Sequence, residues 1–383
     1  MLSRAQAMRL TLRERQARCE DLGRLPQETN QDFADAGFYR ILQPRCFGGY
    51  EFSLTEFVSL LVEITRGCLD SGWVLSQIAS GPVALGRFPA PTQWEAYGRH
   101  GDFRAAMVIR PGGFTIPTPE GYGVQAAWDY CSGCDVATHV LGNVLVRDTI
   151  TKKPTGIACV LVDREQYEIV RNWDMMGMQG TGSHRVVMGE RTIPAHRVQL
   201  MTGDLWEPEN TSGRPILAAS LVGGFAAYAV AVGAARGALD IYDGLLRSKK
   251  WIAPPFPACF ELPDLQHSFG EAQALVDTAE AALTALALRY TSGGRTWHAE
   301  GVPLTAEDLR RIHRAGLQCL EYAWQAVDIM LRTSGSSSAT RQAPLGRYFR
   351  GLAVLRTHLG LQYDHVSINV ARLHFGLPAL SPL

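Results

Sequence analysis

The sequence lacks an excess of charge of either sign. Its 383 residues include 37 lysines and arginines against 37 aspartates and glutamates, and only 19% of residues are charged. A neutral chain without a basic stripe lacks the electrostatic attraction used by nucleic-acid binders, which excludes that class of partner. With 46% hydrophobic residues the chain can form a large core, which excludes disorder. Neutrality also does little to keep copies apart, so self-association is expected.

Targeting signals and membrane spans are also missing. Residues 1–22 alternate charged and apolar side chains, which argues against a signal peptide. The longest weakly polar run, Ile216–Leu239, is rich in alanine and contains Tyr228, Arg236 and glycines. It predicts a helix buried in a bundle rather than a membrane span. We therefore expect a cytoplasmic protein with no membrane partner.

Cysteine is sparse, with eight residues scattered along the chain. Cys131 and Cys134 have C-x-x-C spacing, but no second Cys/His pair accompanies them to complete a metal site. A strand carrying two small thiols is favoured over a disulfide or metal site, and we expect no metal. The signatures G-x-G-x-x-G after a strand, Walker A, H-E-x-x-H and G-x-S-x-G are absent too. An oxidoreductase with this sequence would not bind NAD(P)H through a Rossmann fold.

Three zones of composition divide the chain. In the first, apolar residues follow the spacing of one buried helix face at Phe57, Leu60, Leu61 and Ile64. Asp70-Ser71 precedes another apolar run and predicts an N-cap. In the second zone, glycine and proline separate short runs expected to be strands, namely Ala106–Arg110, Gly123–Cys131, His139–Val146, Ile157–Val162 and Arg185–Met188. In the third zone, long Ala/Leu-rich stretches predict helices over Ile216–Leu246, Leu265–Tyr290, Leu304–Thr333 and Leu345–Gly376.

This order predicts a mainly α protein with a central β-barrel or sandwich insert. The expected units are an N-terminal helical domain (1–105), a β domain (106–211) and a C-terminal four-helix bundle (212–383).

Five segments occur in a characteristic order and span nearly the whole chain: Gly37–Tyr50, Asp70–Val74, Trp128–Asp135, Trp173–Ser183, and Arg347–Arg350 followed by His358. Together they resemble the acyl-CoA dehydrogenase superfamily, and within it the oxygenase components of two-component flavin-dependent hydroxylases. Members of that branch include 4-hydroxyphenylacetate and steroid-phenol hydroxylases and dibenzothiophene monooxygenase. The resemblance implies an acyl-CoA dehydrogenase-like fold and a homotetramer whose flavin sites are shared between subunits.

The same resemblance implies the reaction. Reduced FAD or FMN and O₂ would form a C4a-hydroperoxyflavin, which hydroxylates an aromatic or polycyclic small molecule. A separate NAD(P)H:flavin reductase would supply the reduced flavin. The protein would act as a monooxygenase in a biosynthetic or degradative pathway.

Two segments contain candidate flavin-binding residues. Strand alternation places Trp128, Tyr130 and Ser132 on one face, where a ring can pack on isoalloxazine and a hydroxyl can bond its N5 edge. By resemblance Ser132 is also a catalytic candidate, and Gly133 binds the cofactor. Further along, Thr181, Gly182 and Ser183 combine hydroxyl donors with close backbone approach. The alternatives are an ordinary strand entering a glycine turn and a plain hairpin loop.

His358 is the candidate catalytic base. On one continuous helix, Arg347 and Gly351 would lie within about 20° of its face. By resemblance His358 matches the histidine placed over the flavin C4a position, where it acts on the substrate hydroxyl or steadies the hydroperoxide. An imidazole titrates near neutral pH, which suits such proton transfer. A structural histidine in a helix is the alternative.

Arg247 matches the region from which the family sends an arginine toward a flavin phosphate. It precedes Lys249 and Lys250, and a solvated cationic helix end explains the same pattern.

The candidate substrate pocket contains Trp73, Ser80, Gly81 and Gly351. Many phenol hydroxylases of the family carry a histidine where this chain has Ser80-Gly81-Pro82, so a different or bulkier substrate is expected, such as an indole, a polycycle or an amine. The family's R-x-x-R-D pattern also ends in Gly351 instead of aspartate.

Three alternatives to aromatic hydroxylation follow from the same fold. An acyl-CoA dehydrogenase-like desaturase needs a carboxylate base, but residues 341–383 contain no glutamate and only Asp364 as an acid. A flavin-dependent N-hydroxylase of an amine is a close variant of the oxygenase. A helical-bundle protein that has kept the fold without the cofactor is the third alternative.

Overall fold

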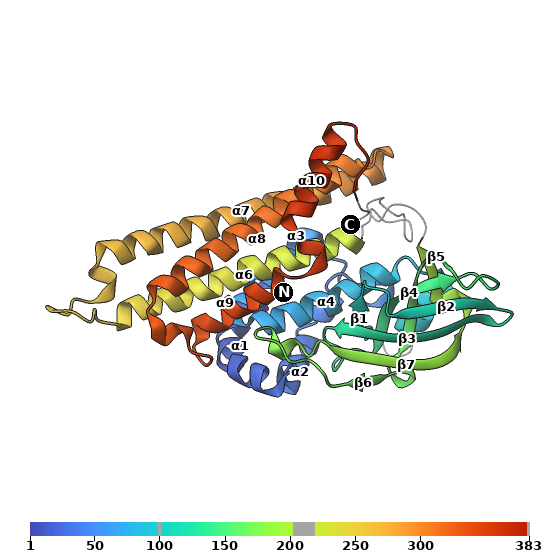
Figure 1. Ribbon diagram of the computed structural model, residues 1–383, viewed down its shortest axis with the longest axis horizontal. Helices are drawn as coiled ribbons and strands as arrows, with labels where there is room; N and C mark the ends of the chain where they lie inside the picture. The colour runs from blue at the N-terminus through green and yellow to red at the C-terminus, as the bar shows by residue number, and fades with distance from the viewer. Residues whose placement is uncertain (99–101, 202–218, 381–383) are drawn as a thin grey trace.

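The structure is a computed structural model that describes residues 1–98, 102–201 and 219–380. Helices lie before and after a central β domain (Figure 1). The N-terminal helices are α1 (Leu2–Leu22), α2 (Gln27–Asp35), α3 (Leu54–Gly67), α4 (Leu69–Leu85) and α5 (Ala90–Gly98). The C-terminal helices are α6 (Ala219–Ser248), α7 (Pro263–Glu300), α8 (Ala306–Thr333), α9 (Pro344–Leu355) and α10 (Tyr363–His374). This order confirms the predicted fold class.

The N-terminal helices follow from local sequence signals. A capping box begins α3, because the Ser53 side chain accepts the Glu56 N–H and the Glu56 carboxylate accepts the Ser53 N–H. The predicted apolar face of α3 is buried, as expected. The predicted N-cap at Asp70-Ser71 is wrong. Helix α4 begins at Leu69 after Cys68, so Asp70 lies in its first turn and is free to cap another segment.

The β domain is one sheet whose strands follow the order β6-β7-β3-β2-β4-β5-β8, with β1 paired to β4. Its strands are β1 (Ala105–Val108), β2 (Gly113–Thr118), β3 (Gly121–Cys131), β4 (His139–Arg147), β5 (Pro154–Asp163), β6 (Glu168–Val170), β7 (His184–Ile193) and β8 (Val198–Met201). Each predicted run overlaps a strand, whereas β2, β6 and β8 were not expected. The expected boundary at 211 lies outside the described residues.

Helix α6 is the central element of the helical part, and α7 and α8 run alongside it (Figure 1). Its segment Leu221–Ser248 is long and apolar enough to cross a membrane, but 89% of its most apolar stretch is buried inside the fold. This confirms the prediction of a buried helix. The predicted helix over Leu345–Gly376 is wrong in one respect: it is divided into α9 and α10 by the short 3-10 turn η8 (Leu359–Leu361).

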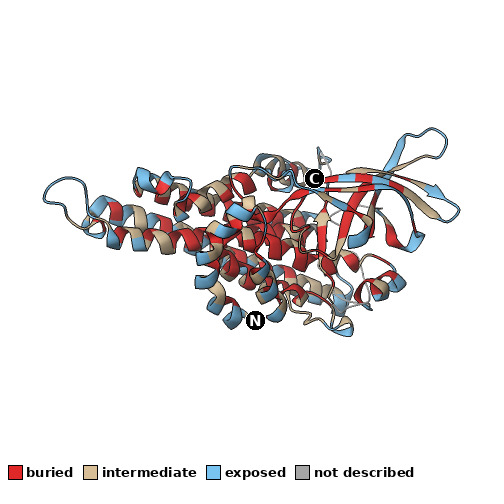
Figure 2. Cartoon of the chain, turned by 90° about the horizontal axis from the view of Figure 1, so that it is seen from below, coloured by how far each residue is buried: buried red, intermediate tan, exposed pale blue. Residues whose placement is uncertain are grey.

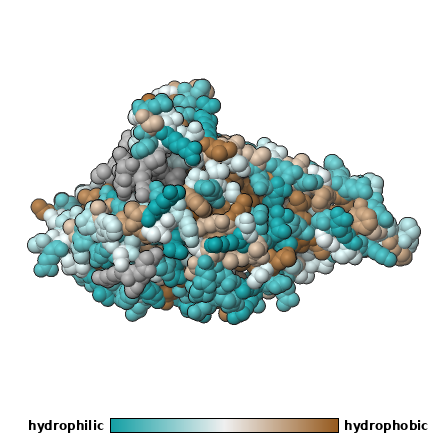
Figure 3. Space-filling view, turned by 180° about the vertical axis from the view of Figure 1, so that it is seen from behind, coloured by the Kyte–Doolittle hydropathy of each residue, from teal (hydrophilic) through white to brown (hydrophobic). Residues whose placement is uncertain are grey.

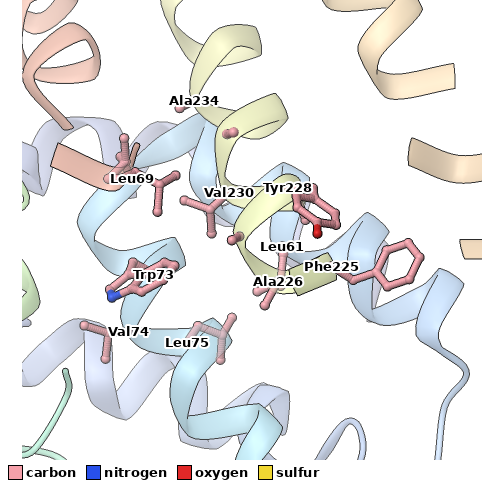
Figure 4. Packing of buried hydrophobic residues seen from close by; sticks show 14 of the residues in the cluster. Leu61, Leu69, Trp73, Val74, Leu75, Phe225, Ala226, Tyr228, Val230 and Ala234 are labelled. Carbon is pink, nitrogen blue, oxygen red and sulfur yellow. The ribbon is translucent and has the colours of Figure 1, made fainter. Parts of the chain in front are cut away.

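Helix α4 joins the helical part to the sheet, because it packs on α6 on one side and on β1 on the other. Figure 2 shows that buried residues concentrate where the helices meet one another and the sheet, while the distant loops and hairpins are exposed. In the core, Leu69 and Trp73 of α4 lie near Val230 and Ala226 of α6 (Figure 4). The candidate site is built on the sheet side of this helix.

Candidate active site

Three hydroxyl side chains meet where β3 ends and where the 3-10 turn η4 (Gln179–Thr181) leads into β7. Ser132 Oγ lies 2.8 Å from Ser183 Oγ, which lies 2.7 Å from Thr181 Oγ1. The Thr181 hydroxyl donates to the Met178 carbonyl at 2.8 Å. All three are buried, and Ser132 is the most accessible at 8% exposure. The structure therefore brings together the predicted residues Ser132, Thr181 and Ser183.

Trp73 begins this hydroxyl chain, and the bond from Thr181 to Met178 sets its direction. Its indole N–H donates to Ser132 Oγ at 3.0 Å. Each hydroxyl has a single proton, and that of Thr181 is used on Met178, so Ser183 must donate to Thr181 and Ser132 to Ser183. The order of donation is Trp73, Ser132, Ser183, Thr181 and the Met178 carbonyl. Ser132 then has no proton left to offer, but it retains one lone pair.

Two predicted glycines shape the backbone around these hydroxyls. Gly133 and Gly182 have φ values of +74° and +54°, a conformation that favours glycine. The Gly133 N–H donates to the Thr181 carbonyl at 3.1 Å and ties the two loops together. A Cβ at Gly133 would lie 3.2 Å from Val74 and Ile78 of α4. Gly133 thus allows its loop to approach α4 closely, whereas a Cβ at Gly182 would lie 3.0 Å from the Asp135 carboxylate and 3.3 Å from the Gly23 carbonyl oxygen.

Asp70, which the sequence predicts as part of an N-cap, is instead a residue of the candidate site. Its carboxylate accepts the Gly180 N–H at 2.8 Å, so it caps η4 rather than its own helix. Desolvation raises the pKa of Asp70 to about 6. The sequence does contain a signal for this role, because Asp70 is a single acid near the start of an apolar helix. A buried carboxylate in such a helix needs a hydrogen-bond partner from another segment.

His358 lies beside Trp73, and their ring centroids are 5.9 Å apart with the planes at 66°. The predicted position on a continuous helix is wrong. His358 follows α9 and forms the N-cap of η8, where its Nδ1 accepts the Gly360 N–H at 3.2 Å. The imidazole is exposed to solvent on one side, and desolvation by the protein lowers its pKa below the usual histidine value. A neutral imidazole is therefore expected near pH 7.

Because α9 ends before His358, the predicted face of Arg347, Gly351 and His358 does not exist. The Arg347 and Arg350 side chains bind Glu20 of α1, with N–O distances of 2.7 and 2.6 Å. This pairing holds the pKa of Glu20 below its usual value. A Cβ at Gly351 would lie 2.6 Å from the Leu69 side chain. Gly351 is thus a point of close helix packing rather than a lining residue of a pocket.

Of the other predicted pocket residues, only Trp73 contacts the candidate site. Ser80 lies seven residues beyond Trp73 on α4, about 10 Å along the helix. Its hydroxyl donates to the Ser76 carbonyl at 2.6 Å. A Cβ at Gly81 would lie 3.0 Å from the Ala105 side chain of β1, so Gly81 allows α4 to pack on the sheet.

Trp128 is not on the same face as Ser132, which corrects the strand prediction. Its ring is fully buried, and its N–H donates to the Asn143 carbonyl at 2.8 Å. The register of β3 against β7 shifts after Trp128, and Tyr130 has a φ of +61° and is 59% exposed. This irregularity breaks the alternation that the prediction assumed. Trp128 packs inside the β domain instead of beside the hydroxyl chain.

Arg247 lies near the C-terminal end of α6, at the opposite end of that helix from the β domain (Figure 1). Its side chain is 70% exposed and pairs with Asp243 at 2.9 Å. Lys249 donates to the Ser334 carbonyl at 2.9 Å. Within one subunit, the predicted flavin-binding arginine is therefore remote from the hydroxyl chain.

The two cysteines with C-x-x-C spacing are buried, free thiols. Burial and the neighbouring Cys134 raise the pKa of Cys131 well above its usual value. The Cys134 thiol donates to the Gly182 carbonyl at 3.4 Å. The pair is thus part of the packing beneath the loop.

Comparison of the chain with known proteins identifies its relatives. Residues 225–363 match the family described as acyl-CoA dehydrogenase, C-terminal domain. The oxygenase subunit HsaA of a flavin-dependent monooxygenase from Rhodococcus jostii is 29% identical, covering 98% of both chains. The oxygenase component of an FADH₂-dependent resorcinol hydroxylase from Rhizobium is 25% identical, covering 94% of this chain and 90% of the relative. This chain is a homologue of flavin-dependent monooxygenase oxygenase components.

The fold agrees with that assignment. The crystal structure of 3-HSA hydroxylase from Rhodococcus sp. RHA1 superposes with a TM-score of 0.89 at 26% identity, covering 99% of this chain and 98% of that one. The resemblance to the oxygenase branch of the acyl-CoA dehydrogenase superfamily is thereby confirmed. The match extends over nearly the full length of both chains.

Proposed function

We propose that this chain is the oxygenase component of a two-component monooxygenase that uses reduced flavin and O₂ to hydroxylate an aromatic or polycyclic small molecule. Reduced flavin, when bound, supplies the electrons with which one oxygen atom of O₂ is transferred to the substrate and the other leaves as water. A separate NAD(P)H:flavin reductase would supply it in the cytoplasm. The observation that carries the proposal is the directed hydroxyl chain that leaves one lone pair of Ser132 available.

The hydroxyl chain suits the reduced form of the cofactor. Reduced flavin has a proton on N5, whereas oxidised flavin has only a lone pair there. Ser132 Oγ accepts from Trp73 and donates to Ser183, so its remaining lone pair can accept an N5–H but has no proton for an oxidised N5. Gly133 and Gly182 allow the backbone to approach a planar ring system closely. Ser132 is therefore proposed to hold the N5 edge, with Thr181 and Ser183 orienting it from behind.

His358 is proposed as the proton-handling group of the reaction. It lies against Trp73, which itself bonds to Ser132, so the imidazole is next to the proposed flavin edge. Desolvation lowers the pKa of His358, and the neutral ring that results can accept a proton or donate a hydrogen bond near pH 7.

Arg247 supports a shared site between subunits. It is too far along α6 to serve the hydroxyl chain of its own subunit, so it would have to reach the flavin phosphate of another copy. Figure 3 shows apolar side chains mixed with hydrophilic ones across the middle of one face. A homotetramer with composite flavin sites agrees with both observations. The exposed Arg247 side chain would exchange Asp243 for the phosphate.

The experiment that tests the function uses the purified chain with chemically reduced FMN or FAD under anaerobic conditions. After admission of ¹⁸O₂ with a panel of phenols, indoles and polycyclic aromatics, we expect a product containing one ¹⁸O atom per molecule. His358→Ala should lose product formation while still binding reduced flavin, whereas His365→Ala, a histidine on α10, should retain both. Reduction of bound oxidised flavin by an acyl-CoA would instead identify a dehydrogenase.

A further inference from the structure

A buried polar pair lies between α6 and α8 and has no part in the proposed function so far. The Tyr228 hydroxyl is hydrogen-bonded to His313 Nδ1. Tyr228 is fully buried and His313 is 6% exposed, within a bundle whose other core side chains are almost all apolar. Figure 4 shows Tyr228 and Phe225 extending from α6 on the side away from Trp73. Buried polar groups are costly unless they are bonded, so this pair needs an explanation.

Two glycines make room for the pair. A Cβ at Gly316 of α8 would lie 2.1 Å from the Tyr228 ring. A Cβ at Gly224 of α6 would lie 2.9 Å from the Tyr228 hydroxyl oxygen and 3.4 Å from His313 Nδ1. Any larger residue at Gly316 would displace the ring. The sequence of both helices therefore accommodates the tyrosine and histidine in one fixed arrangement.

The pair is connected to His358 through the backbone of one residue, Gly360. His313 forms a hydrogen bond with the backbone of Gly360, and because that bond favours the protonated imidazole, the Gly360 carbonyl is the acceptor. The N–H of the same residue donates to His358 Nδ1 at 3.2 Å. Gly360 thus links the buried histidine to the exposed one.

We propose that Tyr228 and His313 are positioning residues that fix the orientation and tautomer of His358 through the backbone of Gly360. The Tyr228 hydroxyl donates to His313 Nδ1, which places the His313 proton on Nε2, where it bonds the Gly360 carbonyl. The Gly360 N–H donates to His358 Nδ1, which places the His358 proton on Nε2. His358 then presents an N–H to the active site.

This inference rests on the proposed function and makes it more specific. Of the two roles open to His358, base or hydrogen-bond donor, the linkage favours the donor. A donor at Nε2 would stabilise negative charge that develops on oxygen at the reacting centre. A base at Nε2 would require the other tautomer, in which Nδ1 carries the proton and meets the Gly360 N–H.

The test measures hydrogen exchange at the C2 position of individual histidines by mass spectrometry across a pH series, using the flavin-free full chain. In Tyr228→Phe and in His313→Leu, we expect the pKa of His358 to rise by roughly 0.5 to 1 unit, because the Gly360 N–H bond is available only to the neutral ring. His313→Gln should preserve the wild-type value, since its amide can donate to Gly360 and accept from Tyr228. An unchanged pKa of His358 in Tyr228→Phe and His313→Leu would overturn the proposal.

A matched control separates positioning from packing. Tyr242 is a second buried tyrosine of α6, and its hydroxyl bonds Thr333 Oγ1 at 2.6 Å. Tyr242→Phe makes the same chemical change on the same helix and should leave the pKa of His358 unchanged. If it shifts that pKa as much as Tyr228→Phe does, the effect is general loosening of the bundle and the linkage is refuted.

A second measurement uses the enzyme with reduced flavin and O₂. In Tyr228→Phe we expect the hydroxylated product per reduced flavin to fall about threefold to tenfold, hydrogen peroxide to rise to match, and KM for the aromatic substrate to stay within twofold. Equal product yield in wild type and Tyr228→Phe would contradict the proposal. If the wild type hydroxylates nothing, the proposed function fails, while the exchange experiment still decides whether the linkage exists.

Discussion

The direction of the hydroxyl chain can be reversed by one substitution behind the proposed flavin contact. In Thr181→Val the side chain keeps its shape but can no longer accept from Ser183. The Ser183 hydroxyl can then turn toward Ser132 and donate to it, which frees the Ser132 proton. Thr181 is only 1% exposed, so the substitution removes no group from the surface that a flavin would contact. The Met178 carbonyl keeps the Trp173 indole N–H as a donor at 2.9 Å.

The expected result is a loss of preference for reduced over oxidised flavin. Ser132 would offer a donor where N5–H needs an acceptor, and a neutral hydrogen bond of about 0.5–1.5 kcal/mol corresponds to roughly 2- to 12-fold in the ratio of the two dissociation constants. The assay is a fluorescence titration with oxidised flavin and an anaerobic absorbance titration with reduced flavin.

The matched control for this prediction is Thr115→Val. Thr115 is a fully buried threonine of β2 whose hydroxyl donates to the Gly123 carbonyl at 3.1 Å. It should leave the ratio of dissociation constants unchanged. A ratio in Thr181→Val that equals the wild-type ratio would refute the directed chain, and so would an equal change in both variants.

Two further predictions concern the segments that hold the loop. Gly177→Ala would bring a Cβ within 2.4 Å of the Arg350 carbonyl group. It should therefore lower the free energy of unfolding, measured by urea denaturation, by about 1–3 kcal/mol. Gly189→Ala is the control, because Gly189 has open space around it and the substitution should not lower stability. Asp70 has a pKa of about 6 in the fold against 3.8 as its ordinary value, so its charge costs stability as the pH rises through this window, and the cost persists above it. Asp70→Asn keeps an acceptor for the Gly180 N–H. It should be more stable than wild type by about 1–2 kcal/mol at pH 8, and the two stabilities should be nearly equal at pH 4. A stability difference that is the same at both pH values would contradict the assigned cause.

The order of helices and strands was predictable because each zone has a clear periodicity or punctuation. The strands that escaped prediction lack such a signal. Strand β2 contains Pro117, which argues against a strand in a central position, yet here Pro117 pairs with Tyr122 next to the hairpin turn. The break between α9 and α10 escapes prediction because Leu352, Leu355 and Leu359 continue at helical spacing into it. The helix ends at Leu355, and contacts with Gly360 rather than composition define the turn that follows.

The candidate site was predictable in its residue types more than in its geometry. Ser132, Thr181 and Ser183 were selected together, and the structure joins them into one hydroxyl chain. The misplacement of Trp128 has a local cause, because a single residue with positive φ, Tyr130, shifts the strand register between it and Ser132. Such an irregularity leaves no periodic trace in the sequence.

Trp73 connects the two halves of the site in a way that no single motif indicates. Its N–H starts the hydroxyl chain that fixes what Ser132 can offer to N5. Its ring contacts His358, whose tautomer is set from the opposite side by Gly360. The donor on His358 and the acceptor on Ser132 are therefore fixed independently, by α8 and by the β domain, and meet on one indole of α4. An enzyme that must keep a reactive reduced flavin oriented gains from this arrangement, because reversing Ser132 would break a buried hydrogen bond and reversing the His358 tautomer would break its bond to the Gly360 N–H.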